Sequence, residues 1–485
     1  MKHPSPSLLI SAAHKSSGKT TISIGLCKAL RDRGLALQPF KKGPDYIDPM
    51  WLSAAAGRSC RNLDFNLMEH PELTAYFERH AAGADLALIE GNKGLYDGLD
   101  LDGGNSNAAL AGLLRAPVVL VIDARGMTRG IAPLILGFQA FDRGIDIAGV
   151  ILNNLGGARH EAKLRAVIEH YTDVPVVGAV HYDARIEIVE RHLGLMPSNE
   201  STEAAARIGE IGIAVSRQVD LDRVLAISGW RPPTRRRGSS RAAAAEAFLA
   251  AAGVRIGWAR DRAFGFYYAD DLDALRQAGA QLVPVDTLRD ARLPPLDGLF
   301  IGGGFPESLM QELEANAALR ADIRRAALGG LPVYAECGGL MYLARSIRWN
   351  GVTRQMAGVI PADVVMHDKP AGRGYVRLRE TEHHPWPQLA AAGSGVELPA
   401  HEFHYSTLEN IGDEVGFGYE VLRGYGIDGD RDGIVYHNVF ASYAHLRSVG
   451  VHNWAARFVA FARRVKAGAR QSAAAAVNRE PELIF

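Results

Sequence analysis

Short apolar runs recur through the first half of the chain. They include "SLLISAA", "ADLALIEG", "APVVLVIDA", "IAGVILNN" and "VPVVGAV", and amphipathic helical patterns separate them. Each run is continuously apolar rather than alternating, which is typical of parallel strands that are covered by helices on both faces. The pattern therefore predicts an α/β domain built on a parallel sheet.

A second series of the same kind follows in the other half of the chain. The segments "GVRIGWARD", "AQLVPVD", "DGLFIGGG" and "LPVYAEC" predict strands with helices between them. After residue 355 the segments become irregular and rich in glycine, which favours antiparallel pairing. The chain therefore contains a second α/β domain of a different design.

The boundary between the two series is marked by composition. The stretch "WRPPTRRRGSSRAAAAEAF" combines prolines, basic residues and alanines, which is typical of a linker. We interpret its arginines as solvated charge rather than a binding patch. We predict domains at 1–228 and 253–466, a linker at 229–252 and a loose tail at 467–485.

The charge balance is even, with 54 Lys and Arg against 54 Asp and Glu. It gives no basis for a nucleic-acid partner, and no stretch approaches the roughly 20 apolar residues of a membrane span. The three cysteines, Cys27, Cys60 and Cys337, lack the pattern of a disulfide framework or a zinc site, so we expect a reducing, cytoplasmic location. The first apolar run leads directly into a loop, and we interpret it as a strand rather than a signal peptide.

That loop is "AHKSSGKT", residues 13–20, between a predicted strand and a predicted helix. It fits the phosphate-loop pattern except that Ala13 replaces the first glycine. In such a loop backbone N–H groups surround the phosphates, the lysine reaches the outer phosphates, and the last hydroxyl binds Mg²⁺. Asn153, at the end of a later strand, is either an amide that reads the base or a turn residue. We predict ATP binding, with Mg²⁺ as cofactor, by Ser16, Ser17, Gly18, Lys19, Thr20 and Asn153.

Carboxylates near the phosphate loop are candidates for holding the metal. Glu90 ends an apolar strand, at the edge where open α/β sheets bind ligands. Each acid considered alone could be a turn or cap residue. The predicted metal ligands are Thr20, Asp48 and Glu90; the surrounding substrate or magnesium region holds Lys42, Asp45, Asp64 and Asp97.

The segment "VYAECGGLMYL", residues 333–343, places Cys337 between a β-prone run and a helix-prone run. The two glycines after it permit a sharp turn, as in a nucleophile elbow whose N–H groups stabilise an oxyanion. A glycine cluster in "LFIGGGFPES" can supply further N–H groups, so Gly303, Gly304 and Gly338 are the predicted oxyanion residues. The alternative is a buried structural cysteine.

A cysteine nucleophile also needs a base. The candidates are His401, His404 and His445, and sequence spacing does not choose between them.

Together these motifs resemble the cobyrinic acid a,c-diamide synthase family, over residues 10 to about 460. The resemblance implies a dethiobiotin-synthetase-like N-terminal domain and a class I glutamine amidotransferase-like C-terminal domain. It also implies Cys337 as nucleophile and His445 as general base. Arg447 stands where many such triads have an acid, so we expect a Cys–His dyad whose imidazole is oriented in another way. The phrases that carry the resemblance are "SSGKTT", "KKGPDYIDP", "NLDFNLM", "EGNKGLYDG", "VERHLGLMPSNE", "ARDRAFGFYY", "GGGFPES", "YAECGGLMYL", "HEFHYS" and "ASYAHL".

The activity that the resemblance implies is ATP-dependent amidation of the a and c carboxylates of cobyrinate or hydrogenobyrinate. It would proceed through an acyl phosphate, with ammonia taken from L-glutamine. Arg447 and Ala400 depart from the residues we expect in cobyrinate-using members, so the tetrapyrrole polycarboxylate stays open. A siroheme amidase is the first alternative, and a partition-type ATPase switch with an inactive glutaminase-like domain is a remote one. A homodimer is a compatible assembly.

Overall fold

The computed structural model describes residues 5–188, 190–191, 194–200, 203–232, 253–387, 397–450 and 452–477. The chain divides into two compact units, Met1–Gly238 and Ser239–Phe485. The division falls within the segment predicted as a linker, 229–252, and residues 233–252 of that segment lie outside the described residues.

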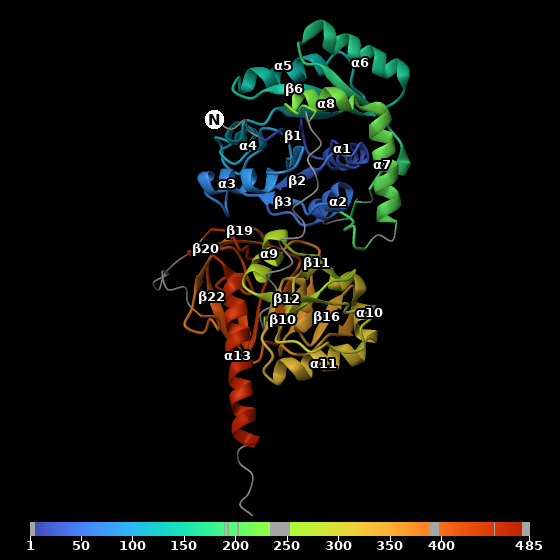
Figure 1. The fold of residues 1–485 in the computed structure, drawn as a ribbon. Coiled ribbons are helices and arrows are strands. Elements are labelled where there is room, and N and C mark those ends of the chain that lie inside the picture. The colour runs from blue at the N-terminus through green and yellow to red at the C-terminus, as the bar shows by residue number, and fades with distance from the viewer. Residues whose placement is uncertain are drawn as a thin grey trace, which may run out of the picture. The chain divides into compact units, whose positions relative to one another are not determined.

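The first unit is built on a seven-stranded sheet in which every neighbouring pair of strands is parallel (Figure 1). The strand order is β3-β2-β4-β1-β5-β6-β7. Five of these strands coincide with the predicted apolar runs, which confirms the parallel-sheet domain. The pattern does not predict β2 or β3, because polar residues interrupt them. The strands are β1 (Ser7–Ala12), β2 (Leu37–Lys42), β3 (Arg61–Leu63), β4 (Leu86–Glu90), β5 (Val118–Asp123), β6 (Ile147–Leu155) and β7 (Val176–His181).

Helices lie on both faces of this sheet. Helices α1, α2 and α7 pack together on one face, and α3, α4, α5 and α6 lie on the other (Figure 1). The apolar side chains of β1, α1, α2 and α7 form one continuous core. The elements are α1 (Lys19–Asp32), α2 (Ile47–Ala56), α3 (His70–Ala81), α4 (Asn107–Leu114), α5 (Ile131–Phe141), α6 (Ala158–Tyr171), η1 (Ala184–Ile186), β8 (Glu190–Arg191), β9 (Gly194–Leu195), α7 (Ala204–Gln218) and α8 (Leu221–Ile227).

The second unit contains a nine-stranded mixed sheet of order β12-β10-β13-β15-β24-β23-β22-β19-β20. The first five strands of this order are parallel and the remaining pairs are antiparallel, as the change of pattern after residue 355 predicts. The strands of this sheet are β10 (Val254–Ala259), β12 (Ala280–Val285), β13 (Gly298–Ile301), β15 (Val333–Glu336), β19 (Gly372–Glu380), β20 (Glu397–His404), β22 (Gly416–Arg423), β23 (Arg431–Tyr436) and β24 (Val439–Ser442).

Smaller elements complete this unit. A four-stranded sheet has the order β17-β16-β18-β21, and a two-stranded ladder joins β11 to β14. The elements are β11 (Phe264–Phe266), α9 (Ala269–Gln277), β14 (Gly303–Gly304), η3 (Pro306–Leu309), α10 (Met310–Ala315), α11 (Ala317–Leu328), α12 (Gly338–Leu343), β16 (Ser346–Trp349), β17 (Val352–Gln355), β18 (Asp363–Met366), β21 (Ser406–Glu409) and α13 (Trp454–Val477).

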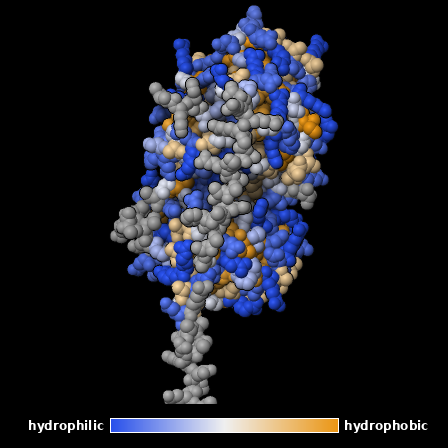
Figure 2. Space-filling model, in the orientation of Figure 1, coloured by the Kyte–Doolittle hydropathy of each residue, from blue (hydrophilic) through white to orange (hydrophobic). Residues whose placement is uncertain are grey.

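The last helix, α13, runs beyond residue 466, where a loose tail is predicted. The alanines in "AGARQSAAAAV", which have high helix propensity, extend this helix to Val477 within the segment predicted as a tail. Residues 478–485 lie outside the described residues. No helix in the described ranges is long and apolar enough to cross a membrane. Hydrophilic residues predominate on the face shown in Figure 2, with apolar residues scattered among them.

Candidate active sites

The first site lies at the carboxyl edge of the parallel sheet, where β1, β2 and β4 end. The phosphate loop follows β1 directly. Pairing of β2 with β4 places Lys41 opposite Glu90, and pairing of β4 with β1 places Glu90 opposite Ile10. Because parallel strands end on the same edge, side chains from four distant segments converge next to the loop.

The phosphate loop is held in an open turn. Ser16 and Gly18 have positive φ angles of 59° and 86°, and Gly18 caps α1 without a side-chain hydrogen bond. Asn153 donates its amide to the Ser17 carbonyl over 3.0 Å, and a Cβ built on Gly18 would lie 2.1 Å from that amide nitrogen. The structure therefore gives Asn153 a third role, which is to hold the loop from β6. The Ser17 hydroxyl turns inward and donates to the His14 carbonyl.

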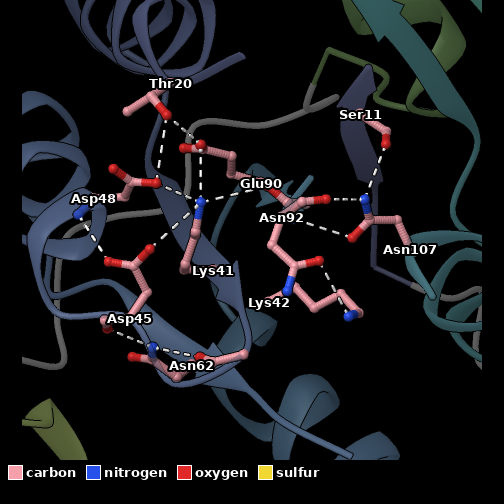
Figure 3. Close-up of polar contacts among 12 residues, drawn as sticks. Ser11, Thr20, Lys41, Lys42, Asp45, Asp48, Asn62, Glu90, Asn92 and Asn107 are labelled. Atoms are coloured by element: carbon pink, nitrogen blue, oxygen red, sulfur yellow. Dashed lines mark hydrogen bonds and ion pairs between the residues drawn. The ribbon is translucent and has the colours of Figure 1, made fainter. Parts of the chain in front are cut away.

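A buried lysine lies at the centre of the acidic group (Figure 3). The Lys41 ammonium is 2.5 Å from Asp48 Oδ2, 3.0 Å from Glu90 Oε1 and 3.8 Å from Asp45 Oδ2. Thr20 donates its hydroxyl to Glu90 Oε1 over 2.6 Å, and its oxygen is 3.4 Å from Asp48 Oδ2. The three predicted metal ligands are thus brought together, with the Lys41 ammonium between two of them.

Burial and charge set the pKa values in this cluster. Burial and the neighbouring Lys41 lower the pKa of Lys19 to about 8. Burial raises the pKa of Glu90, and burial together with Asp48 raises that of Asp45 to about 7. At Lys41 burial opposes the charge, but Asp48 and Glu90 outweigh it and raise the pKa well above its ordinary value. Lys41 is therefore the cation that balances the buried acids.

The donor set fits a hard divalent cation. Glu90 Oε2 is fully buried and has no hydrogen-bond partner within the described part of the chain, so it is an acceptor with a free coordination position. No group of three or more His, Cys, Asp or Glu residues in the described ranges is arranged to hold a metal ion. A cation at Thr20, Asp48 and Glu90 would therefore share its shell with nucleotide phosphates and water, as Mg²⁺ commonly does.

The other predicted residues lie around this cluster. Lys42 donates to the Asn92 side chain over 3.3 Å, and Asp64 lies close enough to raise its pKa, although burial lowers the pKa of Lys42 to about 8 overall. Asp97 is exposed and accepts the Gly94 N–H over 2.8 Å. Lys42 is the last residue of β2, and Asp45, Asp64 and Asp97 lie in the loops that follow strands at the same sheet edge.

The second site is built around a strained cysteine. Cys337 has a φ of 46° between β15 and α12, so the predicted elbow is present. Its backbone N–H donates to the Ser442 carbonyl over 2.7 Å, and its sulfur lies 3.9 Å from the Phe403 carbonyl. Cys337 is 8% exposed, whereas Cys27 is 0% exposed.

The three predicted oxyanion glycines lie beside this elbow. A Cβ built on Gly338 would be 2.8 Å from the Gly304 carbonyl oxygen and 3.0 Å from its nitrogen. A Cβ on Gly303 would be 2.7 Å from Cε1 of His445. Any side chain here would therefore fill the space in which backbone N–H groups could approach a tetrahedral oxyanion.

His445 is the histidine that the structure brings to the thiol. It forms a side-chain hydrogen bond with Cys337, and its Nδ1 lies 3.3 Å from Glu336 Oε2. His401 stacks on it with ring centroids 4.9 Å apart, whereas His404 stacks on Tyr443. The three candidate bases therefore differ in their contacts, and His445 is the one that is hydrogen-bonded to Cys337.

The loop that carries His445 is fixed by buried acids. Asp432 accepts the N–H groups of Tyr443 and Ala444, each over 3.0 Å. The Arg447 guanidinium, at the position where an acid is usual, forms a buried pair with Asp270 at 2.6 Å. Arg447 is therefore anchored to α9 through Asp270.

Two family models match the chain in succession. Residues 9–195 match the CobQ/CobB/MinD/ParA nucleotide binding domain, and residues 255–450 match the CobB/CobQ-like glutamine amidotransferase domain. A protein named cobyrinate a,c-diamide synthase from Magnetococcus marinus is 48% identical over 456 residues, covering 94% of this chain and 97% of the relative. The chain belongs to the cobyrinate a,c-diamide synthase family. Proteins of the same name from Methanosarcina acetivorans and Methanosarcina barkeri are both 41% identical, over 95% and 94% of this chain respectively and 96% of each relative.

Membership of the cobyrinate a,c-diamide synthase family confirms the resemblance and the predicted fold class. The two matched ranges lie in different compact units, so the phosphate loop and Cys337 belong to separate domains. The roles of individual residues stay predictions, supported by the convergence just described.

Sequence reasoning missed a buried asparagine beside the first site. Asn107, at the start of α4, is 0% exposed, and its amide nitrogen lies within 3.1 Å of the Ser11 hydroxyl and the carbonyls of Asn92 and Gly94 (Figure 3). Its carbonyl accepts the Asn92 N–H over 3.1 Å. Asn107 thus holds the loop after Glu90 in place. The only available signal was an asparagine within an otherwise apolar helix.

We expect Asn107→Ala to lower the free energy of unfolding by about 2–4 kcal/mol, because it leaves several buried backbone groups unpaired. The KM for ATP should rise as the loop loosens. Urea unfolding of the full chain and ATP titration measure the two effects. The matched control is Asn105→Ala, which removes an exposed bond to the Leu99 N–H from the same loop. Equal unfolding midpoints for the two variants would contradict the assigned role.

Proposed function

We propose that this protein is an ATP-dependent, glutamine-hydrolysing ligase that amidates the a and c carboxylates of cobyrinate. The observation that carries the proposal is the end-to-end similarity to proteins of that name, in a chain that also contains the residues proposed for both half-reactions. The ATP half contains Lys19, Thr20 and Glu90, and the glutamine half contains Cys337 and His445. A partition-type ATPase switch with an inactive glutaminase-like domain would not need Cys337 and His445.

Glutamine hydrolysis begins with the Cys337 thiolate. Its sulfur attacks the side-chain amide carbon of glutamine, and the developing oxyanion lies near the N–H groups of Gly303, Gly304 and Gly338. The imidazolium of His445 donates a proton as the carbon–nitrogen bond breaks, so the leaving group is ammonia. Water then attacks the thioester with His445 as base, which releases glutamate and regenerates the thiolate.

The other half activates the acid. A peripheral carboxylate oxygen of the tetrapyrrole attacks the γ-phosphorus of ATP, and ADP leaves as the acyl phosphate forms. Lys19 stabilises the charge on the transferring phosphoryl group, and the loop N–H groups bind the other phosphates. Ammonia attacks the acyl carbon, phosphate departs, and the amide remains.

Mg²⁺ is part of the proposal as the partner of ATP. Thr20, Asp48 and Glu90 would hold it, since their oxygens converge and Glu90 Oε2 is available. When bound, the ion supplies neutralisation of phosphate charge. Lys41 forms ion pairs with Asp48 and Glu90 in this structure. When Mg²⁺ binds these two acids, the Lys41 ammonium must therefore either move away or remain beside the ion.

Mass spectrometry of the products tests the function. The purified protein is incubated with ATP, Mg²⁺ and glutamine, with cobyrinate and siroheme in parallel. We expect the mass change of two carboxylate-to-amide conversions on cobyrinate, at positions a and c. Amidation of siroheme alone would keep the mechanism and replace the substrate, and ATP hydrolysis without any amidation would favour the switch.

A homodimer and a cytoplasmic location complete the proposal. The three free cysteines are consistent with a reducing compartment. Light scattering of the purified chain measures the assembly.

A further inference from the structure

Glu336 is a buried carboxylate directly before the nucleophile. It ends β15 with a side chain that is 3% exposed. One oxygen, Oε1, accepts the Tyr334 hydroxyl over 2.6 Å and the Leu446 N–H over 3.0 Å. The other, Oε2, lies 3.3 Å from Nδ1 of His445. The carboxylate is thus fixed at one oxygen and directed at the imidazole with the other.

This arrangement determines which nitrogen of His445 faces the thiol. A proton on Nδ1 that points at Glu336 leaves Nε2 for Cys337, and a carboxylate at Nδ1 stabilises the imidazolium. The Leu446 N–H fixes the backbone next to His445 to the same carboxylate. The Glu336 carboxylate therefore contacts both the imidazole ring of His445 and the backbone of the loop that carries it.

Arg447 occupies the position at which such an acid is expected, and it forms an ion pair with Asp270. We propose that Glu336 is the positioning carboxylate of the glutaminase site, so that the site is a Cys337–His445–Glu336 triad with its acid on the strand before the nucleophile. The proposal rests on the glutaminase role proposed above and assigns the orienting group that the dyad expectation left open.

The charges around His445 favour this assignment. Burial alone would lower the pKa of His445, but its hydrogen bonds to Cys337 and Glu336 raise it to about 10. On the opposite side, burial and the neighbouring His445 lower the pKa of His401, so the stacked ring is neutral. The Arg447 cation is paired with Asp270 on α9, and on that same helix Asp271 accepts the Ser448 N–H and the indole of Trp454. Glu336 is therefore the carboxylate that contacts the imidazole.

The test is Glu336→Gln, which keeps the shape and removes the charge. We expect kcat for glutamine hydrolysis to fall by roughly 10⁴-fold, on the order of the loss when a histidine-orienting carboxylate is neutralised, with little change in KM. The pH profile of iodoacetamide alkylation at Cys337 should move to higher pH, because a weaker imidazolium stabilises the thiolate less. Ammonia-dependent amidation should keep its native rate.

A matched control is Glu402→Gln, a second buried glutamate, on β20, whose carboxylate accepts the N–H groups of Tyr425 and Gly426. It should lower stability without moving the alkylation profile. Glu336→Asp, which retains the charge, should keep most of the native profile and serves if the Gln variant does not fold. A Glu336→Gln enzyme with native kcat and profile, or a shift shared equally with Glu402→Gln, would overturn the proposal. Failure of the proposed function is distinguishable, since the native enzyme would then not hydrolyse glutamine.

Discussion

Cys337→Ser is expected to abolish glutamine-dependent amidation and to leave ammonia-dependent amidation at its native rate. A hydroxyl beside His445 is a far weaker nucleophile than a thiolate, so the loss should be about 10³-fold or more. The ATP half does not contain Cys337, because the phosphate loop and the acids of the first site lie in the other compact unit. The measurement is the initial rate of amide formation with glutamine or, in parallel, ammonium chloride at mildly alkaline pH.

The control for thiol removal is Cys60→Ala. Cys60 is 3% exposed in the core of the first unit, and burial raises the pKa of its thiol well above the ordinary value. This variant should keep both activities, because a neutral buried thiol takes no part in either half-reaction. Loss of both activities in Cys337→Ser would show that the two halves do not have separate roles.

Lys19→Met is expected to impair the ATP-dependent half-reaction and to spare glutamine hydrolysis. Its ammonium is the phosphate-loop cation, and the side chain is only 8% exposed. Removing it should lower amidation by about 10³-fold with either nitrogen donor, since acyl phosphate formation loses its main side-chain charge stabilisation. Glutamine hydrolysis at Cys337, measured as glutamate release, should persist. ADP formation and glutamate release assayed on one sample give both values.

Lys28→Met is the matched control on the same helix. Lys28 pairs with Asp32 over 2.5 Å on the partly exposed face of α1, so its removal should change stability little and both activities not at all. ATP consumption at the native rate by the Lys19→Met enzyme would contradict the role of Lys19 in acyl phosphate formation. Together with Cys337→Ser, the variant separates the two half-reactions within one chain.

Much of the fold and both reactive centres could be predicted from the sequence. Continuous apolar runs indicate parallel strands, and "SSGKT" and "AECGG" encode backbone conformations that few other sequences adopt, as the φ angles at Ser16, Gly18 and Cys337 show. Strand β2 escaped prediction because "LQPFKK" contains a proline and two lysines, although all six residues are buried. That strand carries Lys41, the cation at the centre of the first site.

The sequence by itself determined the fold class and predicted the phosphate loop and the nucleophile, because each rests on local periodicity or on a local turn that its own residues specify. The tertiary structure alone decided which partners these groups have. It brought His445, the histidine that the family resemblance implies as base, to Cys337, placed Lys41 between Asp48 and Glu90, and brought Glu336 to the imidazole. Such pairings depend on strand order and register across long sequence separations. No local pattern specifies them.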